Sequence, residues 1–435
     1  MASVSRDHIL FRFSCLLLLI GSSHSLRDTL LHGQQLKHGQ ELVSANGVFR
    51  LGFFSSAFTE KSYVGIWYNK SPHEKPVWVA NRNTPIFNNS GILALHGNLK
   101  ILQSGGDPIV LTSVRGARKT SATLLDSGNF VLHEHNLEGS IKQVLWQSFD
   151  HPTDTILPGM KLGNDHKTGI NRSLTSWRSD RSPASGSFTL CMDLINGTTQ
   201  FVIWWNGNIH WTTKLPELSL NEDYKFRYIS SENETYLSYS LNKDISKIFP
   251  MLTLSASGDL LDHDNYSVVS CANIPFYASS GCVQHMLPEC RISHNSFVHQ
   301  MGFMSREGLI FSENDNLSLA DCEAKCTSDC SCVAYASKDI DGTGCEYWSS
   351  KSSFKESTLD GWRDVYILES KEWTWWRWVM IFIGGTLLKF LLCTPYFIWK
   401  RSKAKEKWKA KEKCERKGHH KFSSTSYLPI IGFFR

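Results

Sequence analysis

Residue patterns that catalysis would require are missing from this sequence of 435 residues. It contains no Gly-x-Ser-x-Gly turn of the kind that presents a hydrolase serine. It also lacks the protein-kinase set of a Gly-rich loop, a strand lysine, a His-Arg-Asp loop and Asp-Phe-Gly. The 36 residues after Trp399 are too few to hold that set. We therefore expect no enzymatic activity from the chain as given.

Metal-binding patterns are also scarce. The pairs His133-x-His135 and His419-His420 have no further ligands at a suitable spacing. The acidic stretch 259–264 lacks the glycine and the terminal glutamate of a calcium loop. We expect these side chains to be solvated, and we expect no metal or other cofactor.

Positive charge is concentrated near the C-terminus. The formal net charge is +5, but the stretch from Lys400 to Lys421 alone holds eleven Lys or Arg against three Glu. The rest of the chain is therefore close to neutral or slightly acidic, and a nucleic-acid partner is not expected, because such a partner requires a basic surface. The basic stretch could bind anionic lipid or act only as a stop-transfer signal, and we favour the second.

Residues 1–25 have the pattern of a secretory signal peptide. Arg6 and Arg12 precede an apolar run from Phe13 to Ile20, and Ser25 closes a small-residue cleavage site. The run is too short to cross a bilayer. It predicts that the following residues enter the secretory pathway.

A second apolar stretch, residues 378–399, is long enough to cross a bilayer as one helix. Aromatic residues flank it, and the lysine-rich residues 400–435 follow it. The positive-inside rule then places the N-terminal part outside and residues 400–435 in the cytoplasm. We expect a single-pass type I protein of the plasma membrane.

One charge interrupts this apolar stretch. Lys389 lies near its middle, where a charged side chain costs about 2.5 to 3.5 kcal/mol on insertion. Lys389 should therefore reach toward the interface, face a partner, or weaken insertion. We favour the first interpretation, with help from Thr394 and Pro395.

Acceptor sequences for N-glycosylation occur only between the signal and the apolar stretch, which agrees with this topology. The weakest is Asn69, because Pro72 follows its Ser71. The seven asparagines are Asn69, Asn88, Asn171, Asn196, Asn233, Asn265 and Asn316.

Residues 26 to about 270 alternate short apolar runs with Gly, Asn, Asp and Ser at intervals of roughly 8 to 12 residues. This spacing predicts many short strands and an all-β barrel or prism. An internal repeat indicates two such units. Three segments recur at offsets of 139, 137 and 133 residues: Gly47–Leu51 as Gly186–Leu190, Ile66–Asn69 as Ile203–Asn206, and Trp78 as Trp211. Shrinking offsets in the same order are typical of duplicated units with loops of different length; chance similarity among aromatic strands is the alternative.

Three motifs resemble the plant S-domain (G-type lectin) receptor-like serine/threonine kinase family. They are Leu145–Gly163 (LWQSFDHPTDTILPGMKLG), Trp78–Ile86 (WVANRNTPI) and Leu174–Arg178 (LTSWR). The resemblance covers about residues 28 to 368. It implies a mostly β protein in which tandem bulb-type lectin-like prism or barrel units precede a disulfide-rich α+β module of the PAN/apple type and one transmembrane helix.

The resemblance also implies domain boundaries. We expect a signal peptide at 1–25, a bulb-type lectin domain at 26–150, an S-locus-glycoprotein or second lectin-like domain at 151–285, a PAN/apple domain at 286–368, the transmembrane helix at 378–399 and the basic tail at 400–435.

Nine of the twelve cysteines fall in the expected extracellular part, where oxidising conditions favour disulfides over a zinc site. The run Cys322–Tyr335 resembles the PAN/apple module. That resemblance implies the pairs Cys322–Cys345 and Cys326–Cys332, which leaves Cys290 with Cys330. Cys191, Cys271 and Cys282 form an odd trio, so one of them is free or bridges to another chain. The EGF-like stretch usual in the family is missing or reduced here.

Bulb-type lectins hold mannose with Gln-x-Asp-x-Asn-x-Val-x-Tyr, whose alternate residues face one pocket. The best match starts at Leu125, and its later positions are Ser127, Asn129, Val131 and His133. Only Asn129 and Val131 retain the family residue. Without the amide and the carboxylate we expect weak or absent mannose binding, and Asn129 is as readily a turn residue.

We expect a cell-surface recognition receptor whose ectodomain, of the pollen-recognition type, binds an extracellular ligand, either a glycan, a peptide or a lipid. Without a kinase domain it would act as a co-receptor or decoy in a homo- or heterodimer with receptor-like kinases. One alternative is a partial or spliced product of a full receptor kinase. Another is a mannose-binding defence lectin.

Overall fold

The computed structural model describes residues 27–55, 59–71, 75–116, 119–195, 197–214, 224–241, 249–271, 281–283, 287–292, 296–311, 317–349, 351–356, 363–369 and 372–418. It divides into two compact parts. One part holds the strands up to residue 368, and the other holds the long C-terminal helix. The predicted signal peptide lies outside the described residues.

The chain begins with three antiparallel sheets, here called the first β unit. Each sheet pairs short strands through hairpins or longer returns. The orders are β1 (Thr29–Leu31), β11 (Thr120–Leu124), β12 (Phe130–His135), β13 (Ile141–Gln147); β10 (Ile109–Val110), β9 (Asn98–Leu102), β8 (Ile92–His96), β2 (Gln35–Lys37); and β3 (Glu41–Val43), β4 (Phe49–Ser55), β5 (Lys61–Tyr68), β6 (Trp78–Val79), with β7 (Ile86–Phe87) also on β5.

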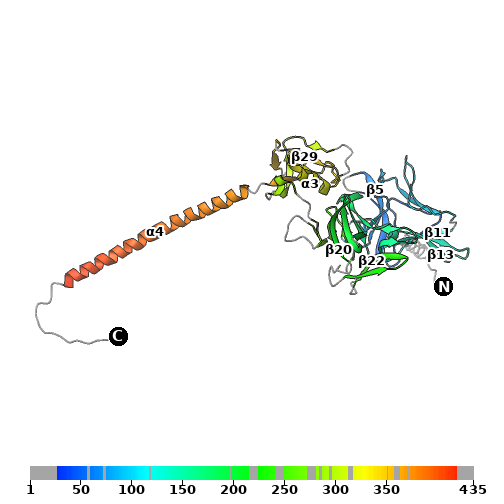
Figure 1. Cartoon of the computed structure of the whole chain (residues 1–435), viewed down its shortest axis with the longest axis horizontal. Helices are drawn as coiled ribbons and strands as arrows, with labels where there is room; N and C mark the ends of the chain where they lie inside the picture. The colour runs from blue at the N-terminus through cyan, green and yellow to red at the C-terminus, as the bar shows by residue number, and fades with distance from the viewer. Residues whose placement is uncertain are drawn as a thin grey trace, which may run out of the picture. The chain divides into compact units, whose positions relative to one another are not determined.

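Three more antiparallel sheets form the second β unit, which includes β20 and β22 in Figure 1. A 3-10 turn, η1 (Ser148–Asp150), precedes it. The orders are β14 (Thr155–Ile156), β23 (Leu252–Leu254), β24 (Leu260–Leu261), β25 (Ser267–Val269); β16 (Asn171–Arg172), β15 (Leu162–Asp165), β22 (Glu234–Leu241), β21 (Tyr224–Ser230); and β17 (Leu174–Ser179), β18 (Ser182–Ile195), β19 (Thr198–Trp205), β20 (Asn208–Lys214).

The two units repeat one another in strand register. In the first, Phe49 pairs with Tyr68 and Ile66 pairs with Trp78. In the second, the residues at the predicted offsets pair in the same way: Phe188 with Trp205, and Ile203 with Trp211. The tandem arrangement expected from the sequence is therefore confirmed at the level of individual residue pairs.

A pair of turn glycines, one in each unit, also follows the repeat. Gly128 has φ +84° and lies against the ring of Phe49, and Gly258 has φ +87° and lies against the ring of Phe188. A left-handed backbone of this kind favours glycine. The two glycines are 130 residues apart, which continues the decreasing offsets of 139, 137 and 133 residues between the two units.

Both units are built around a continuous apolar core. Leu51, Ile66 and Leu93 of the first unit are fully buried, and Leu190 and Ile203 of the second are at most 1% exposed. These residues belong to a single buried cluster that runs through both units. Alternation along each strand puts one face of every sheet into this cluster, so the units share a core as well as a linker.

A third module, here called the cystine module, follows. It has one antiparallel sheet and two short helices, with β29 and α3 labelled in Figure 1. The sheet order is β27 (Leu309–Ile310), β29 (Glu346–Ser349), β28 (Cys332–Ala336), β31 (Arg363–Glu369), β26 (Ser296–Met304), β30 (Phe354–Glu356), and the helices are α2 (Glu289–Ile292) and α3 (Leu319–Ser328).

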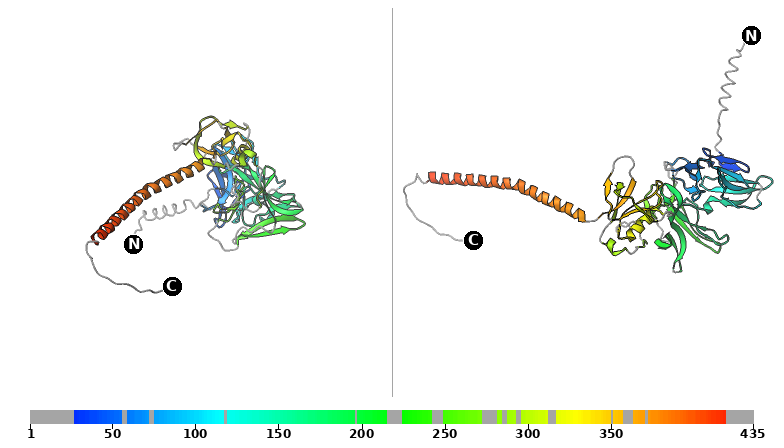
Figure 2. Two further views of the ribbon diagram at one scale, coloured as in Figure 1. Left: turned by 60° about the vertical axis from the view of Figure 1, so that its left-hand side comes forward. Right: turned by 90° about the horizontal axis from the view of Figure 1, so that it is seen from above.

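The second compact part is dominated by one helix, α4 (Glu372–Gly418). Both views of Figure 2 draw it as a single continuous ribbon. It continues beyond Trp399 into the lysine-rich stretch, where the sequence predicts a tail separate from the transmembrane helix. Alternating Lys, Ala and Glu are good helix formers, so the helix has no local reason to stop at the end of the apolar stretch.

One arginine joins the two β units. Arg82 follows β6 in the first unit, and its guanidinium donates to three carbonyls of the second: Nε to Pro183 O at 2.8 Å, Nη1 to Thr175 O at 2.9 Å and Nη2 to Ser176 O at 2.7 Å. Burial lowers the pKa of Arg82, and Asp154 partly opposes this. Five donors in a rigid fork make arginine the side chain suited to this contact.

We expect Arg82→Ala to destabilise the protein by at least about 3 kcal/mol, because three carbonyls lose a charged donor inside the structure. Arg82→Lys should recover only part of this, since lysine lacks the planar fork. The measurement is the urea midpoint of the full chain in detergent micelles, followed by tryptophan fluorescence. Arg227→Ala, at an exposed position on β21, is the matched control. Equal midpoints for Arg82→Ala and the unchanged chain would contradict the assignment.

Candidate functional site

The predicted sugar-binding residues lie on β12 and the turn before it, and they differ in exposure. Ser127 is exposed, His133 is half-buried, and Val131 is 3% exposed within the sheet. Asn129 is 8% exposed. Two of the four are thus buried, although the apolar core takes the alternate residues Phe130 and Leu132.

The amide of Asn129 is already bonded on both sides. Its Nδ2 donates to Gln147 Oε1 at 2.9 Å, and its Oδ1 accepts from Ser148 Oγ and from Phe149 N, both at 3.2 Å. These partners belong to the segment that leads into the second β unit. These bonds use both lone pairs of the amide oxygen and one of the two N–H donors of Nδ2, so Asn129 helps to position the joint between the units and keeps little capacity for a sugar hydroxyl.

His133 lies beside His135, and the centroids of the two imidazole rings are 6.5 Å apart. Burial, followed by the neighbouring His135, lowers the pKa of His133. His135 in turn is hydrogen-bonded to Ser121 Oγ at 2.7 Å. His133 is therefore largely neutral at pH 7 and is available only for weak polar contacts.

The cystine module docks on the second β unit through a buried carboxylate. Asp321 is 5% exposed. Its Oδ1 accepts from Trp205 Nε1 at 3.0 Å and from Asn206 Nδ2 at 2.8 Å, and its Oδ2 accepts from Ser187 Oγ. Asp321 also caps its own helix, because Ser318 N donates to it at 2.9 Å. One side chain thus begins α3 and fixes it to β18 and β19.

A second carboxylate ties the cystine module to both β units. Asp341 is 4% exposed and forms an ion pair with Lys61 Nζ of β5 at 3.0 Å. Its backbone carbonyl accepts from Ser179 Oγ of β17. Burial would raise the pKa of Asp341, but hydrogen bonds from Thr343 and the contact with Lys61 lower it below its usual range. Asp321 behaves alike: burial is outweighed by donors on Ser187, Ser318 and Trp205, and its pKa is lowered.

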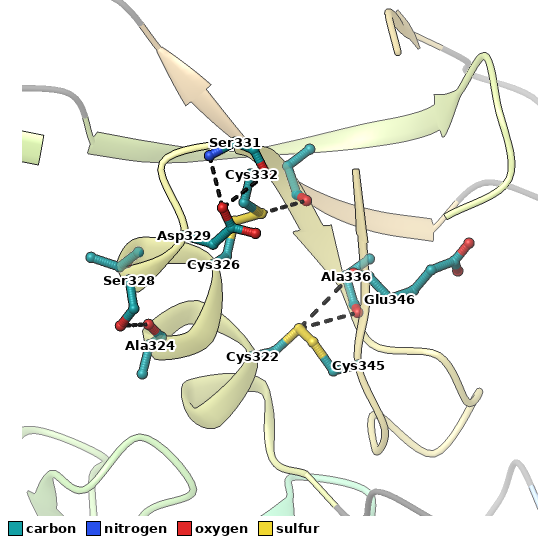
Figure 3. Close-up of a disulfide and its surroundings, with 12 residues drawn as sticks. Cys322, Ala324, Cys326, Ser328, Asp329, Ser331, Cys332, Ala336, Cys345 and Glu346 are labelled. Carbon is teal, nitrogen blue, oxygen red and sulfur yellow. Dashed lines mark hydrogen bonds between the residues drawn. A yellow bond between two sulfur atoms is a disulfide. The ribbon is translucent and has the colours of Figure 1, made fainter. Parts of the chain in front are cut away.

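Disulfides hold the cystine module together. Cys322 and Cys326 project from one side of α3, toward Cys345 and Cys332 respectively (Figure 3). Cys290 pairs with Cys330. These are the pairs that the family resemblance implies. Cross-links that close loops of this kind restrict the unfolded chain and so stabilise the module.

The remaining cysteines between the predicted signal peptide and α4 divide into a pair and a single thiol. Cys271 and Cys282 form a disulfide across 11 residues. Cys191, on β18, is free and half-buried. Burial raises the pKa of Cys191 to about 11, so its thiol is protonated at neutral pH and poorly reactive.

The glycosylation asparagines differ in exposure. Asn88, Asn171, Asn233 and Asn265 are exposed. Asn69 is half-buried, and its Nδ2 donates to Gly47 O at 3.1 Å. The other two, Asn196 and Asn316, lie outside the described residues.

Within the described residues, one helical stretch, Val379–Lys413, is long and apolar enough to cross a membrane. Pro395 lies inside α4, and Thr394 Oγ1 donates to Phe390 O at 2.8 Å. The hydroxyl of Thr394 is thus bound to its own helix. Residues 419–435 lie outside the described residues.

Comparison with known proteins identifies two domains. Residues 76–178 match a family described as D-mannose binding lectin, and residues 305–352 match a PAN-like domain. The first match runs from β6 of the first β unit to β17 of the second, and the second match covers β27, α3, β28 and β29 of the cystine module.

Full-length relatives fall into two classes. A G-type lectin S-receptor-like serine/threonine-protein kinase of Arabidopsis thaliana is 37% identical over 96% of this chain and 52% of its own length. An Arabidopsis thaliana protein named "Putative inactive G-type lectin S-receptor-like serine/threonine-protein kinase SRK" is 30% identical over 84% of this chain and 78% of its own length. An S-locus-specific glycoprotein of Brassica oleracea is 28% identical over 80% and 90%. The chain thus spans about half the length of the receptor kinases that it matches.

The two buried carboxylates predict acid sensitivity. Their pKa values in the folded protein lie below those of an unfolded aspartate, about 3.9, so they contribute stability above that pH and lose it as pH falls through the lowered values. We expect the urea midpoint of the full chain to drop steeply below about pH 4. Asp321→Asn should cost at least about 2 kcal/mol at pH 7 and flatten this drop, whereas Asp107→Asn, at an exposed position, should change neither. A midpoint independent of pH from 5 to 2.5 would contradict the role of both carboxylates.

In plant cells we expect glycans on Asn88, Asn171, Asn233 and Asn265, which are exposed, and an unmodified Asn69, because Pro72 directly follows its acceptor sequence. Peptide mass spectrometry after enzymatic deglycosylation reads each site separately. Full occupancy of Asn69 would show that Pro72 does not prevent its glycosylation.

Proposed function

Because the chain belongs to the G-type lectin S-receptor-like family, we propose that its β units and cystine module form the ligand-recognising ectodomain of a cell-surface receptor. The observation that carries this proposal is the order of parts: a disulfide-bonded, β-rich body precedes one helix of membrane length with a basic flank. Disulfides belong to oxidising compartments and the basic flank to the cytoplasmic side. We infer a single-pass type I protein of the plasma membrane.

Coupling between modules supports a receptor rather than a simple sugar-binding protein. Arg82, Asp321 and Asp341 fix three modules to one another through buried polar contacts. A ligand that binds any one module therefore acts on the whole extracellular body. We propose that binding of such a ligand changes the contact between this body and a neighbouring receptor.

We propose that signalling output comes from a kinase-bearing member of the same family, with this chain as co-receptor or decoy. The relatives named as kinases are about twice as long as the part that this chain matches. A dimer of one such kinase with this chain would have a single kinase domain and could not phosphorylate in trans. If the chain is instead a segment of a longer receptor kinase, sequencing the full transcript will show a frame that continues into a kinase domain.

Recognition of mannose through the residues of β12 and the turn before it is not favoured. Asn129 is committed to Gln147, Ser148 and Phe149, and Val131 is buried. We propose that the ligand contacts other surfaces, and we expect no binding of the chain to mannose glycans on an array.

The test is co-precipitation of the tagged full chain with family receptor kinases from plant plasma membranes, followed by a phosphorylation assay. We expect at least one kinase to be retained and its autophosphorylation to fall as the level of this chain rises. Protease added to intact cells should remove the β units and the cystine module. Failure to retain any family kinase would remove the co-receptor hypothesis, and protection from external protease would remove the receptor topology.

A further inference from the structure

The apolar stretch of α4 carries one charge at its centre. Lys389 lies ten residues after Val379 and ten before Trp399. At 1.5 Å per residue, each end of the stretch is about 15 Å away. The four-methylene stem of lysine is much shorter than this, and Lys389 is exposed on the helix surface. A bilayer around this helix would therefore surround the ammonium group with hydrocarbon.

The helix itself offers Lys389 no counter-charge. The stretch 379–399 contains no Asp or Glu. The hydroxyls of its two threonines are used locally: Thr386 Oγ1 donates to Phe382 O at 2.9 Å, and Thr394 Oγ1 donates to Phe390 O at 2.8 Å. Thr394 is five residues on and so lies about 140° around the helix. Since helical side chains lean toward the N-terminus, Lys389 also points away from Thr394 and Pro395, which does not favour the assisted snorkelling expected from the sequence.

The surface around Lys389 allows close approach of another helix. Gly385 and Cys393 lie four residues before and after it, on the same side of α4. A methyl group placed at Gly385 would meet no atom within 4 Å. Small residues at this spacing let a second backbone come near the lysine without steric conflict.

We propose that this face of α4, centred on Lys389, docks a transmembrane helix of a different protein that carries a carboxylate at the same depth. A carboxylate compensates the lysine charge inside the bilayer. A second copy of this chain would instead set lysine against lysine, which disfavours a homodimer through this face. The inference rests on the proposed membrane span, and it adds the chemistry of the partner to the proposed co-receptor role.

The test uses the full chain in phosphatidylcholine vesicles at neutral pH, with fluorescent Leu-Ala transmembrane peptides as probes. One peptide carries a single central Glu, and two matched peptides carry Gln or Leu at that position. Energy transfer between a label on the chain and one on the peptide reports association. We expect the Glu peptide to bind about tenfold more tightly than the Leu peptide, with Gln close to Leu. Lys389→Leu should abolish the preference, Lys389→Arg should keep it, and Lys405→Leu, beyond the apolar stretch, should leave it unchanged.

Protease protection of the same samples reports insertion independently. If Lys389→Leu inserts and still prefers the Glu peptide, the docking inference is overturned and the receptor topology stands. If Gln binds as tightly as Glu, charge pairing is overturned in the same way. If the unchanged chain fails to insert, both the docking face and the proposed topology fall.

Discussion

The contact between one guanidinium and three backbone carbonyls holds the two β units together. Arg82 spans from the first β unit to Thr175, Ser176 and Pro183 of the second. Carbonyls at a strand end and a bulge would otherwise remain buried without donors, which is costly. Because β17 and β18 are the strands that also receive the cystine module, through Ser179 and Ser187, the position of the third module depends on the same junction.

The cystine module depends on two different kinds of constraint. Disulfides restrict its own chain, so its internal fold does not rely on a large apolar core. Its attachment relies on Asp321 and Asp341, each buried and each satisfied by donors from another module. A buried charge without these donors would be strongly unfavourable, so correct docking and correct folding of α3 are linked.

Sequence patterns predicted what is local or repeated. Strand periodicity indicated the β class, and the recurrence of Phe49 and Trp78 as Phe188 and Trp211 predicted a second unit of the same kind. The matching register of the paired strands is visible only in the structure. The contacts of Arg82 and Asp321 could not be predicted in this way. Arg82 stands within a recognised motif, but its acceptors are 93 to 101 residues away. Ser318-x-x-Asp321 reads as a helix cap, and nothing nearby shows that Trp205 also donates to it. Asn129 fits the spacing of the sugar-binding motif, but that spacing does not show that its amide already has hydrogen-bond partners.

The duplicated turn glycines separate backbone shape from side-chain chemistry. Gly128 and Gly258 are 130 positions apart, yet each has a phenylalanine ring where a side chain would begin. The residue after each glycine differs, Asn129 in one copy and Asp259 in the other. The same bend thus presents an amide in the first unit and a carboxylate in the second, so a change of polar group beside either bend leaves the ring contact of its glycine in place.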